Sequence, residues 1–198
     1  GYLGSLFAGI VWENGAVLSH AASGETYLPF GQLDARLLTA IEEAGIPFER
    51  GLAIAATWTP HDQALWRILS SHGGSTSVEY NKGAVMVLPP GATKGSGLER
   101  LLALCGLSPR NLAAFGDAEN DLSMMTLAEV SVAVGDAVPA VIETADVHAT
   151  APGPRVSLRF STSIRWAGNF LISLLNASDR SYWARLKTAQ LSISQLPS

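Results

Sequence analysis

The chain alternates short apolar runs with helical segments from residue 93 to residue 149, and this alternation limits the possible folds more than any other feature. The expected helices cover 93–104, 119–127 and 138–144, and the expected strands cover 111–115, 130–134 and 147–149. Parallel neighbouring strands need a crossover connection, which an intervening helix supplies. The sequence therefore predicts an α/β fold with a parallel sheet in this part of the chain.

Residues before 93 follow a different order. Asn14 and Gly15 lie between two apolar runs, which is typical of a hairpin turn. The expected elements that follow are helices over 33–44 and 60–72 and strands over 52–58, 77–80 and 84–88. Such a segment folds as a small sheet with both helices on one face. We therefore divide the chain into a core segment (1–27), an inserted α+β module (28–88), a second core segment (89–150) and a tail (151–198).

Composition excludes some classes of function. The formal net charge of -4 argues against a nucleic-acid binder, whose surface is basic. No apolar run reaches the ~18–20 residues that span a bilayer. Cys105 is the only cysteine, so no disulfide framework can form, and this fits a reducing cytoplasm.

The tail differs from the rest of the chain in charge. Residues 1–150 carry 16 acidic and 7 basic side chains, whereas residues 151–198 carry one acidic and six basic side chains. Apolar residues keep helical spacing in part of the tail, which predicts a packing helix over 164–175 followed by a disordered end. A basic aromatic helix on a membrane or nucleic-acid surface, and a non-native end of the chain, are the alternatives.

Polar residues follow the strand expected at 111–115. Gly116-Asp117-Ala118-Glu119-Asn120-Asp121 joins that strand to the next helix. Carboxylate and carboxamide oxygens at a strand end suit Mg²⁺ and a phosphate ester together. An ordinary acidic helix start accounts for the same residues, because Asp and Asn favour N-cap positions.

Two other turns contain residues of interest. Lys94 lies at the start of the helix expected at 93–104, where unpaired backbone N–H groups and an ammonium group favour phosphate. The alternative is a solvated loop lysine, and the segment does not match a Walker A loop. Asp136 follows the strand expected at 130–134, and we expect it to cap the next helix.

In their order along the chain, these segments resemble the haloacid dehalogenase superfamily of phosphatases, and most closely the capped, Cof-type branch that includes sucrose and trehalose phosphate phosphatases. The matching segments are Thr93-Lys94-Gly95, Phe115-Gly116-Asp117-x-x-Asn120-Asp121, Val132-Ala133-Val134-Gly135-Asp136-Ala137 and Ala145-Asp146, with Glu13-Asn14-Gly15-Ala16 and Asn81-Lys82-Gly83-Ala84-Val85 on either side of the inserted module. The resemblance covers about residues 8–150. It implies a Rossmann-like core, incomplete at its N-terminus, with residues 28–88 as a cap.

The resemblance also implies roles for individual residues. Lys94 and Asp117 would be catalytic, with Lys94 neutralising the phosphate and a phosphoaspartate intermediate. Asp117 and Asp121 would form the Mg²⁺ site, and Asn120 would bind phosphate together with Lys94. The implied activity is Mg²⁺-dependent hydrolysis of a small phosphorylated, sugar-like substrate.

The chain departs from the family pattern in one respect. The family places its nucleophile in an Asp-x-Asp pair at the end of the first core strand, before the Asn14-Gly15 turn. No aspartate precedes Asn14, and no Asp-x-Asp occurs anywhere in the 198 residues. We therefore expect a fragment that lacks the nucleophile, with an open sheet edge that invites self-association. The alternative is a non-catalytic module that binds phosphate or metal, so the sequence leaves enzymatic activity of this chain open.

Overall fold

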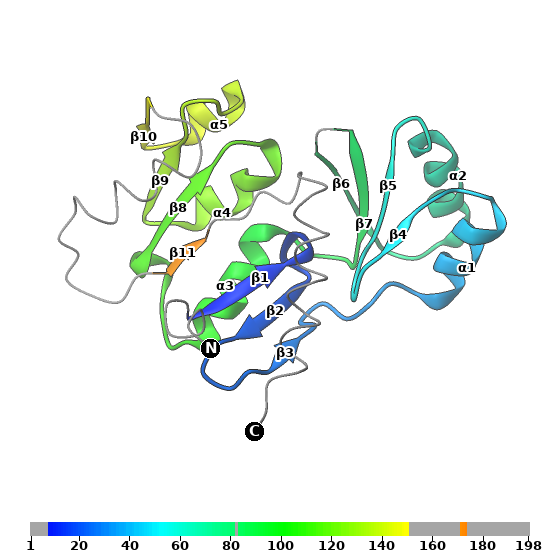
Figure 1. Ribbon diagram of the computed structural model, residues 1–198, viewed down its shortest axis with the longest axis horizontal. Helices are drawn as coiled ribbons and strands as arrows, with labels where there is room; N and C mark the ends of the chain where they lie inside the picture. The colour runs from blue at the N-terminus through cyan, green and yellow to red at the C-terminus, as the bar shows by residue number, and fades with distance from the viewer. Residues whose placement is uncertain (1–7, 82, 151–170, 174–198) are drawn as a thin grey trace, which may run out of the picture.

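The second half of the chain forms a parallel sheet, as the strand and helix alternation predicts. The computed structural model describes residues 8–81, 83–150 and 171–173. In this sheet the order is β10-β9-β8-β11, and each pair of neighbours runs parallel (Figure 1). Its strands are β8 (Leu112–Gly116), β9 (Val130–Ala133), β10 (Val147–His148) and β11 (Leu171–Ser173).

Helical segments lie before and between these strands along the chain and pack on the sheet. The helical elements are α3 (Lys94–Leu104), η2 (Pro109–Asn111), η3 (Glu119–Asp121), α4 (Leu122–Leu127) and α5 (Pro139–Thr144). On one face of β8, Leu112 and Ala114 pack in a cluster with Leu98 of α3 and Met125 of α4. The intervening β8 residues, including Phe115, pack in a second cluster on the other face. Strand β8 is thus buried on both faces, which explains why its sequence is an unbroken apolar run.

An antiparallel sheet precedes this core and packs on α3. Its strands are β1 (Gly9–Trp12), β2 (Val17–His20) and β3 (Thr26–Tyr27), in the order β1-β2-β3, and η1 (Glu13–Gly15) lies in the turn between β1 and β2. Leu18 of β2 belongs to the same apolar cluster as the leucines of α3. The hairpin predicted at Asn14-Gly15 is confirmed, although the turn also includes Glu13. Strand β3 was not predicted, because two residues carry too little periodicity to detect.

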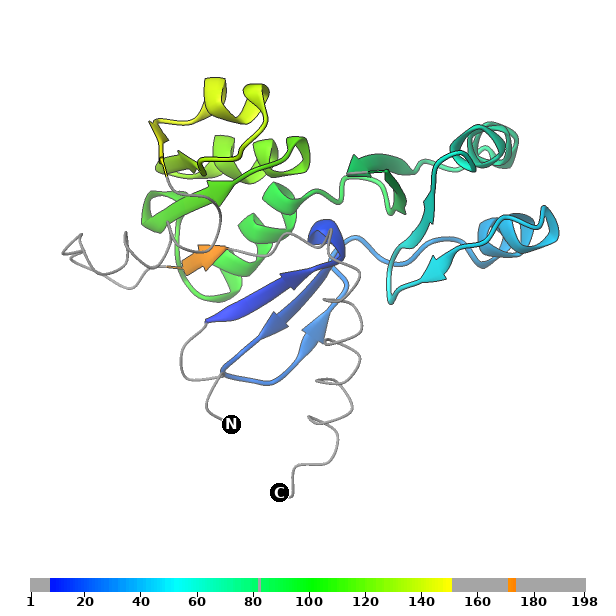
Figure 2. The same ribbon diagram turned by 45° about the horizontal axis from the view of Figure 1, so that its top comes forward.

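The segment between β3 and α3 folds as a separate α+β unit, which we call the insert. Its elements are α1 (Ala35–Glu43), β4 (Glu49–Arg50), β5 (Ala55–Trp58), α2 (Asp62–His72), β6 (Ser77–Asn81) and β7 (Ala84–Leu88). The strands form an antiparallel sheet in the order β4-β5-β7-β6. Leu37 of α1 and Leu65 of α2 pack in one cluster with Val85 and Val87 of β7. Both helices therefore cover the same face of the sheet, as expected (Figures 1 and 2).

Both predicted helices of the insert are present, and each begins two residues later than expected. Asp34 is the N-cap of α1, and its carboxylate accepts the backbone N–H of Arg36 at 2.9 Å. Gly73 ends α2 in the left-handed conformation that glycine adopts without steric cost. The chain enters and leaves the insert through residues 28–34 and 89–93 (Figure 1).

The tail differs from expectation in the three residues that the structure describes. Leu171–Ser173 form β11, so the helix predicted over 164–175 is wrong at these positions, and the remainder of that segment lies outside the described residues. In β11, Leu171 lies opposite Leu112 and Ser173 lies opposite Ala114. The edge of a strand offers unpaired backbone N–H and C=O groups. Hydrogen bonding to these groups stabilises a strand at residues 171–173 more than the weak helical pattern of the tail stabilises a helix. The edge of β8 that we expected to be open is therefore covered over these three residues.

Candidate phosphate and metal site

Asp121 organises the acidic turn that follows β8. Asp121 is 3% exposed, and its Oδ2 accepts hydrogen bonds from the backbone N–H groups of Asp117 at 2.9 Å and Ala118 at 3.2 Å. Its Oδ1 forms an ion pair with the ammonium group of Lys94. A Cβ at Gly116 would lie 2.7 Å from the Cβ of Asp121, so only glycine lets the strand end approach this closely. The structure thus brings together two predicted residues that are 27 positions apart.

Lys94 is held at this place by the start of α3. Thr93 is the N-cap, and it exchanges hydrogen bonds with Ser96 in a capping box. The backbone N–H of Gly95 donates to Ser123 Oγ at 3.0 Å, and a side chain at position 95 would overlap the Ser123 carbonyl group. The first turns of α3 and α4 therefore touch directly. The Lys94 side chain is only 12% exposed. The fixed backbone at the start of α3 places it beside Asp121.

Asn120 is buried beside this pair, with one of its amide atoms available. The residue is 7% exposed, and its Nδ2 donates to Asn14 Oδ1 at 3.1 Å. Its Oδ1 is buried and has no hydrogen-bond partner among the residues that the structure describes. Buried polar atoms without partners are rare and point to a missing partner such as water or a ligand. Sequence reasoning placed Asn14 in a hairpin turn beside the insert and did not assign it to this site, 106 residues away.

Asp117 and Asp136 lie in neighbouring turns with different exposure. Asp117 is partly exposed, and its backbone carbonyl accepts the N–H of Val138 at 2.9 Å. Asp136 is exposed, and the N-cap of α5 is Val138, which makes no side-chain cap. The prediction that Asp136 caps this helix is therefore wrong, because the chain takes two more residues to enter the helix and Pro139 begins it.

The donor set fits a magnesium site only if phosphate and water complete it. In the part of the chain that the structure describes, no three His, Cys, Asp or Glu side chains gather as a metal-binding group. Mg²⁺ commonly keeps several waters and binds through one or two carboxylates together with phosphate oxygens. Both Asp121 oxygens accept hydrogen bonds within the protein, which suits this carboxylate to hold Lys94 and the 117–118 backbone. The metal roles of Asp117 and Asp121 remain predictions.

The insert places one acidic side chain near Lys94. Strand β6 lies against η3, and Glu79 of β6 faces the same side of the sheet as Met86, opposite to α1 and α2. Burial raises the pKa of the half-buried Glu79 carboxyl, and the positive charge of Lys94 opposes this rise. The helix-free face of the insert therefore contributes to the surroundings of the lysine, which the sequence did not indicate.

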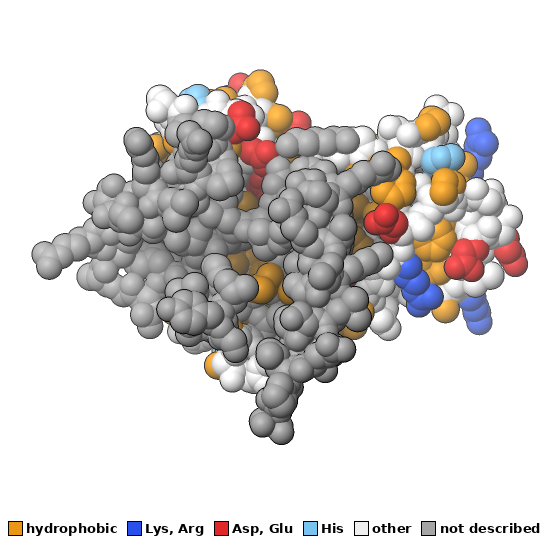
Figure 3. All heavy atoms as spheres, in the orientation of Figure 1, with side chains coloured by type: hydrophobic (Ala, Val, Ile, Leu, Met, Phe, Trp, Pro, Cys, Tyr) orange, Lys and Arg blue, Asp and Glu red, His pale blue; other side chains and the backbone are white. Residues whose placement is uncertain are grey.

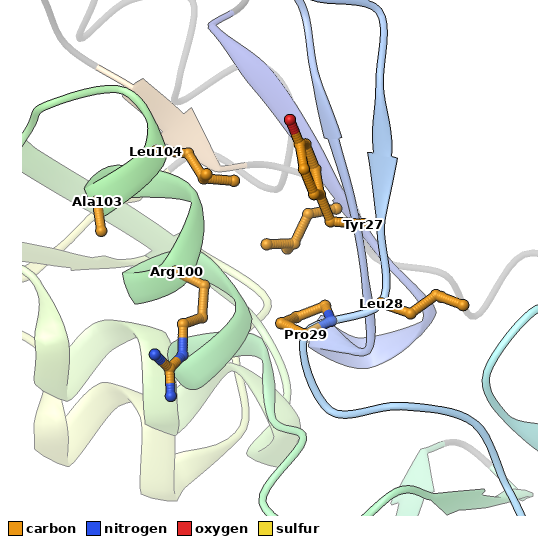
Figure 4. Close-up of a pocket in the computed structure, with 7 residues that line it drawn as sticks. Tyr27, Leu28, Pro29, Arg100, Ala103 and Leu104 are labelled. Atoms are coloured by element: carbon orange, nitrogen blue, oxygen red, sulfur yellow. The ribbon is translucent and has the colours of Figure 1, made fainter.

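A separate pocket lies on another side of α3. Its volume is about 440 Å³, and its walls are mostly apolar: Leu18, Tyr27, Leu28, Pro29, Arg100, Ala103 and Leu104. In Figure 4, the guanidinium group of Arg100 is directed away from Tyr27. None of the predicted site residues lines this pocket, so we keep it distinct from the candidate site.

Comparison with known proteins agrees with this geometry. The sequence profile of the haloacid dehalogenase-like hydrolase family matches residues 59–151. The phosphoglycolate phosphatase of Methanoculleus marisnigri is 30% identical over an alignment of 150 positions, which covers 69% of this chain and 63% of that protein. Phosphoglycolate phosphatase 2 of Saccharolobus solfataricus is 37% identical over 70 residues, which are 35% of this chain and 30% of that protein. The chain thus spans less than two thirds of the length of either relative.

Solved structures share the fold at low sequence identity. A haloacid dehalogenase-like hydrolase from Bacteroides thetaiotaomicron superposes with a TM-score of 0.61 at 19% identity, covering 74% of this chain and 73% of that one. A sugar phosphatase of haloacid dehalogenase subclass IIB superposes with a TM-score of 0.62 at 19% identity, covering 81% of this chain and 78% of that one. The family profile, the relatives and the shared fold show that this chain belongs to the haloacid dehalogenase-like hydrolase superfamily.

Proposed function

We propose that this chain carries the phosphate- and magnesium-binding part of the active site of a phosphate monoester hydrolase. The observation that supports the proposal is the ion pair between Lys94 and Asp121 at the carboxyl end of β8. A lysine at a helix start beside a glycine turn is suited to phosphate. The buried Oδ1 of Asn120, which has no hydrogen-bond partner in the described part of the chain, lies in the same turn as Asp117 and Asp121.

Each residue then has a distinct part in binding. The Lys94 ammonium group would neutralise phosphate oxygens, and the Asn120 carboxamide would orient the bound group by hydrogen bonding. Asp117 would hold Mg²⁺, while Asp121 would keep Lys94 and the 117–118 backbone in place. Mg²⁺, when bound, supplies charge neutralisation and a template for in-line displacement. Catalysis in such a site rests on positioning and electrostatics.

The proposed substrate is a small, phosphorylated, sugar-like molecule. Two relatives are named phosphoglycolate phosphatases, and one structural neighbour is a sugar phosphatase. We propose that the insert acts as a cap, because Glu79 on its helix-free face lies near Lys94. A carboxylate at that place would accept hydrogen bonds from substrate hydroxyl groups.

Partners of other classes find no support in the described residues. In the view of Figure 3, acidic and basic side chains are interspersed over the insert and form no basic stripe. Among residues 8–81, 83–150 and 171–173, no helix combines the length and apolar character that a bilayer crossing needs. We propose a cytoplasmic location from the single cysteine, as the sequence suggests.

Calorimetric titration with inorganic phosphate and Mg²⁺ tests the proposal. We expect phosphate binding that Mg²⁺ strengthens and that Lys94→Met weakens by at least about tenfold, the factor for ~1.4 kcal/mol. Arg100→Met is the matched control, because it removes an exposed positive charge from the same helix. Equal affinities for the wild type and Lys94→Met, or no binding at all, would refute the proposed site.

A non-catalytic binding module is the second candidate, and the absence of Asp-x-Asp from the 198 residues favours it for the isolated chain. We therefore expect binding without hydrolysis of p-nitrophenyl phosphate in the presence of Mg²⁺. Turnover that disappears in Asp117→Ala would rule out this candidate. The same result would contradict our expectation that these residues lack a nucleophile.

A further inference from the structure

The turn Glu13–Gly15 is strained and tightly held. Glu13 and Asn14 have positive φ values of 46° and 56°, which non-glycine residues rarely adopt. Gly15 has a φ of 100°, and a side chain there would overlap the carbonyl group of Thr93. Strain of this kind persists only where the surroundings hold the backbone in place. The residues that contact this turn therefore indicate its structural role.

Glu13 holds the tip of a hairpin in the insert. Its carboxylate is buried, with the residue 9% exposed, and it accepts three successive backbone N–H groups. These come from Leu52 at 2.7 Å, Ala53 at 2.8 Å and Ile54 at 3.2 Å, in the loop between β4 and β5. Successive N–H groups that converge on one carboxylate form a strong anion-binding arrangement. This carboxylate thus attaches the insert to the core in addition to its two chain connections.

An apolar cluster supports the same junction. Ala53 and Ile54 from the insert pack with Ala16 and Val17 of the hairpin, and each of the four is at most 4% exposed. A Cβ added at Gly51 would lie 2.5 Å from Glu13 Oε1 and 2.7 Å from both Cδ and Oε2, so the loop closes directly over the carboxylate. A side chain at position 51 would therefore displace the Glu13 carboxylate, whereas the backbone conformation of Gly51 does not itself demand glycine.

The other two residues of the turn contact the candidate phosphate site. Asn14 Oδ1 accepts the amide group of Asn120, as described above. Gly15 lies against Thr93, and a side chain at Gly97 would overlap the backbone of Gly15. Three consecutive residues therefore contact the insert, the acidic turn and the first turn of α3.

We propose that Glu13 is a positioning residue that couples the orientation of the insert to the phosphate site. Its carboxylate holds the 52–54 loop, and the turn that it begins holds Asn120 and the N-terminus of α3. A displacement of the loop moves the turn, and the turn moves the Asn120 carboxamide. The proposal rests on the function proposed above, since it assigns a role to a contact of that same site.

NMR spectra of the ligand-free chain test the coupling without any phosphate. The variants are Glu13→Gln, which replaces the carboxylate with an amide, and Gly51→Ala, which pushes on the flexible end of Glu13 from the insert. We expect both to shift the side-chain amide signals of Asn120 and the backbone signal of Lys94. The Gly51→Ala variant alone decides the question if Glu13→Gln does not fold.

Two matched controls separate coupling from general disturbance. Glu99→Gln changes an exposed glutamate on α3, and Gly74→Ala adds a Cβ in the insert whose nearest neighbour would be 3.5 Å away. Neither control should move the Asn120 signals. Shifts in Gly51→Ala that stay within the insert and leave Asn120 unchanged would overturn the proposal.

Phosphate titration then relates the coupling to binding. We expect Glu13→Gln to raise the dissociation constant for inorganic phosphate by about tenfold, as for coupled neighbouring residues. An unchanged constant, with wild-type binding intact, would overturn the proposal. A wild-type chain that binds no phosphate would overturn the proposed function instead, and the ligand-free spectra would still decide whether Glu13 couples the insert to Asn120.

Discussion

The ion pair between Lys94 and Asp121 predicts an asymmetry between two substitutions. Asp121 accepts two backbone N–H groups in addition to Lys94, and its side chain is 4% exposed. Asp121→Asn removes the negative charge and leaves the Lys94 ammonium group, 12% exposed, without the carboxylate that it pairs with. Removing one partner of a buried pair typically costs about 3–5 kcal/mol, because the other charge stays desolvated. We expect Asp121→Asn to lower the free energy of unfolding by about 3 kcal/mol.

Lys94→Met should cost less. The Asp121 carboxylate keeps its hydrogen bonds to Asp117 and Ala118, and the methionine side chain fills most of the space of the lysine stem. We expect a loss of about 1 kcal/mol, in the range of one hydrogen bond. In the double variant the two losses should not add, because residues in direct contact couple.

Urea unfolding followed by circular dichroism measures all of these values by linear extrapolation. Glu119→Gln is the control, because Glu119 lies in the same turn but is exposed, and it should stay within about 0.5 kcal/mol of wild type. The reasoning is refuted if Asp121→Asn costs less than about 1 kcal/mol. It is also refuted if Lys94→Met costs as much as Asp121→Asn.

Three further changes have outcomes that follow from the contacts of individual side chains. Asp34→Ala should lower the free energy of unfolding by about 1 kcal/mol, because it removes the N-cap of α1; urea unfolding measures this, and no change would contradict the cap. The hydroxyl and backbone N–H of Ser131 donate hydrogen bonds to the Asp146 carboxylate and hold its pKa below the usual 3.8. This pair therefore stabilises the folded protein above pH 3.8, and the stabilisation is lost as the pH falls through the lowered pKa. Ser131→Ala should therefore raise the pKa of Asp146 in an NMR titration, and an unchanged value would count against the hydroxyl contact. Lys94→Met should raise the pKa of Glu79 further, because the lysine charge opposes the effect of burial; a fall in that pKa would show that the two groups do not interact as the structure indicates.

Local sequence patterns determined most of the regular elements. The helix expected over 93–104 is observed at Lys94–Leu104, and the strand expected over 111–115 is observed at Leu112–Gly116. Both succeed because the determining signals lie within the segment: a capping threonine, leucines at helical spacing, and an apolar run between turns. The α/β class follows from the order of such segments. The residues at the candidate site could also be named, since Lys94 and the 116–121 turn follow strands or begin helices.

Tertiary structure alone decided which distant residues meet. Strand β11 exists because β8 presents an edge, and nothing in Leu171–Ser173 by itself distinguishes a strand from a helix. The pairing of Asn14 with Asn120, and of Glu13 with the 52–54 loop, joins segments that are far apart in sequence. Periodicity and capping report on neighbours along the chain, whereas these contacts depend on how whole elements pack. The sequence by itself therefore determined the elements and the chemical groups of the candidate site, and the packing of the hairpin, the insert and α3 decided how those groups are held.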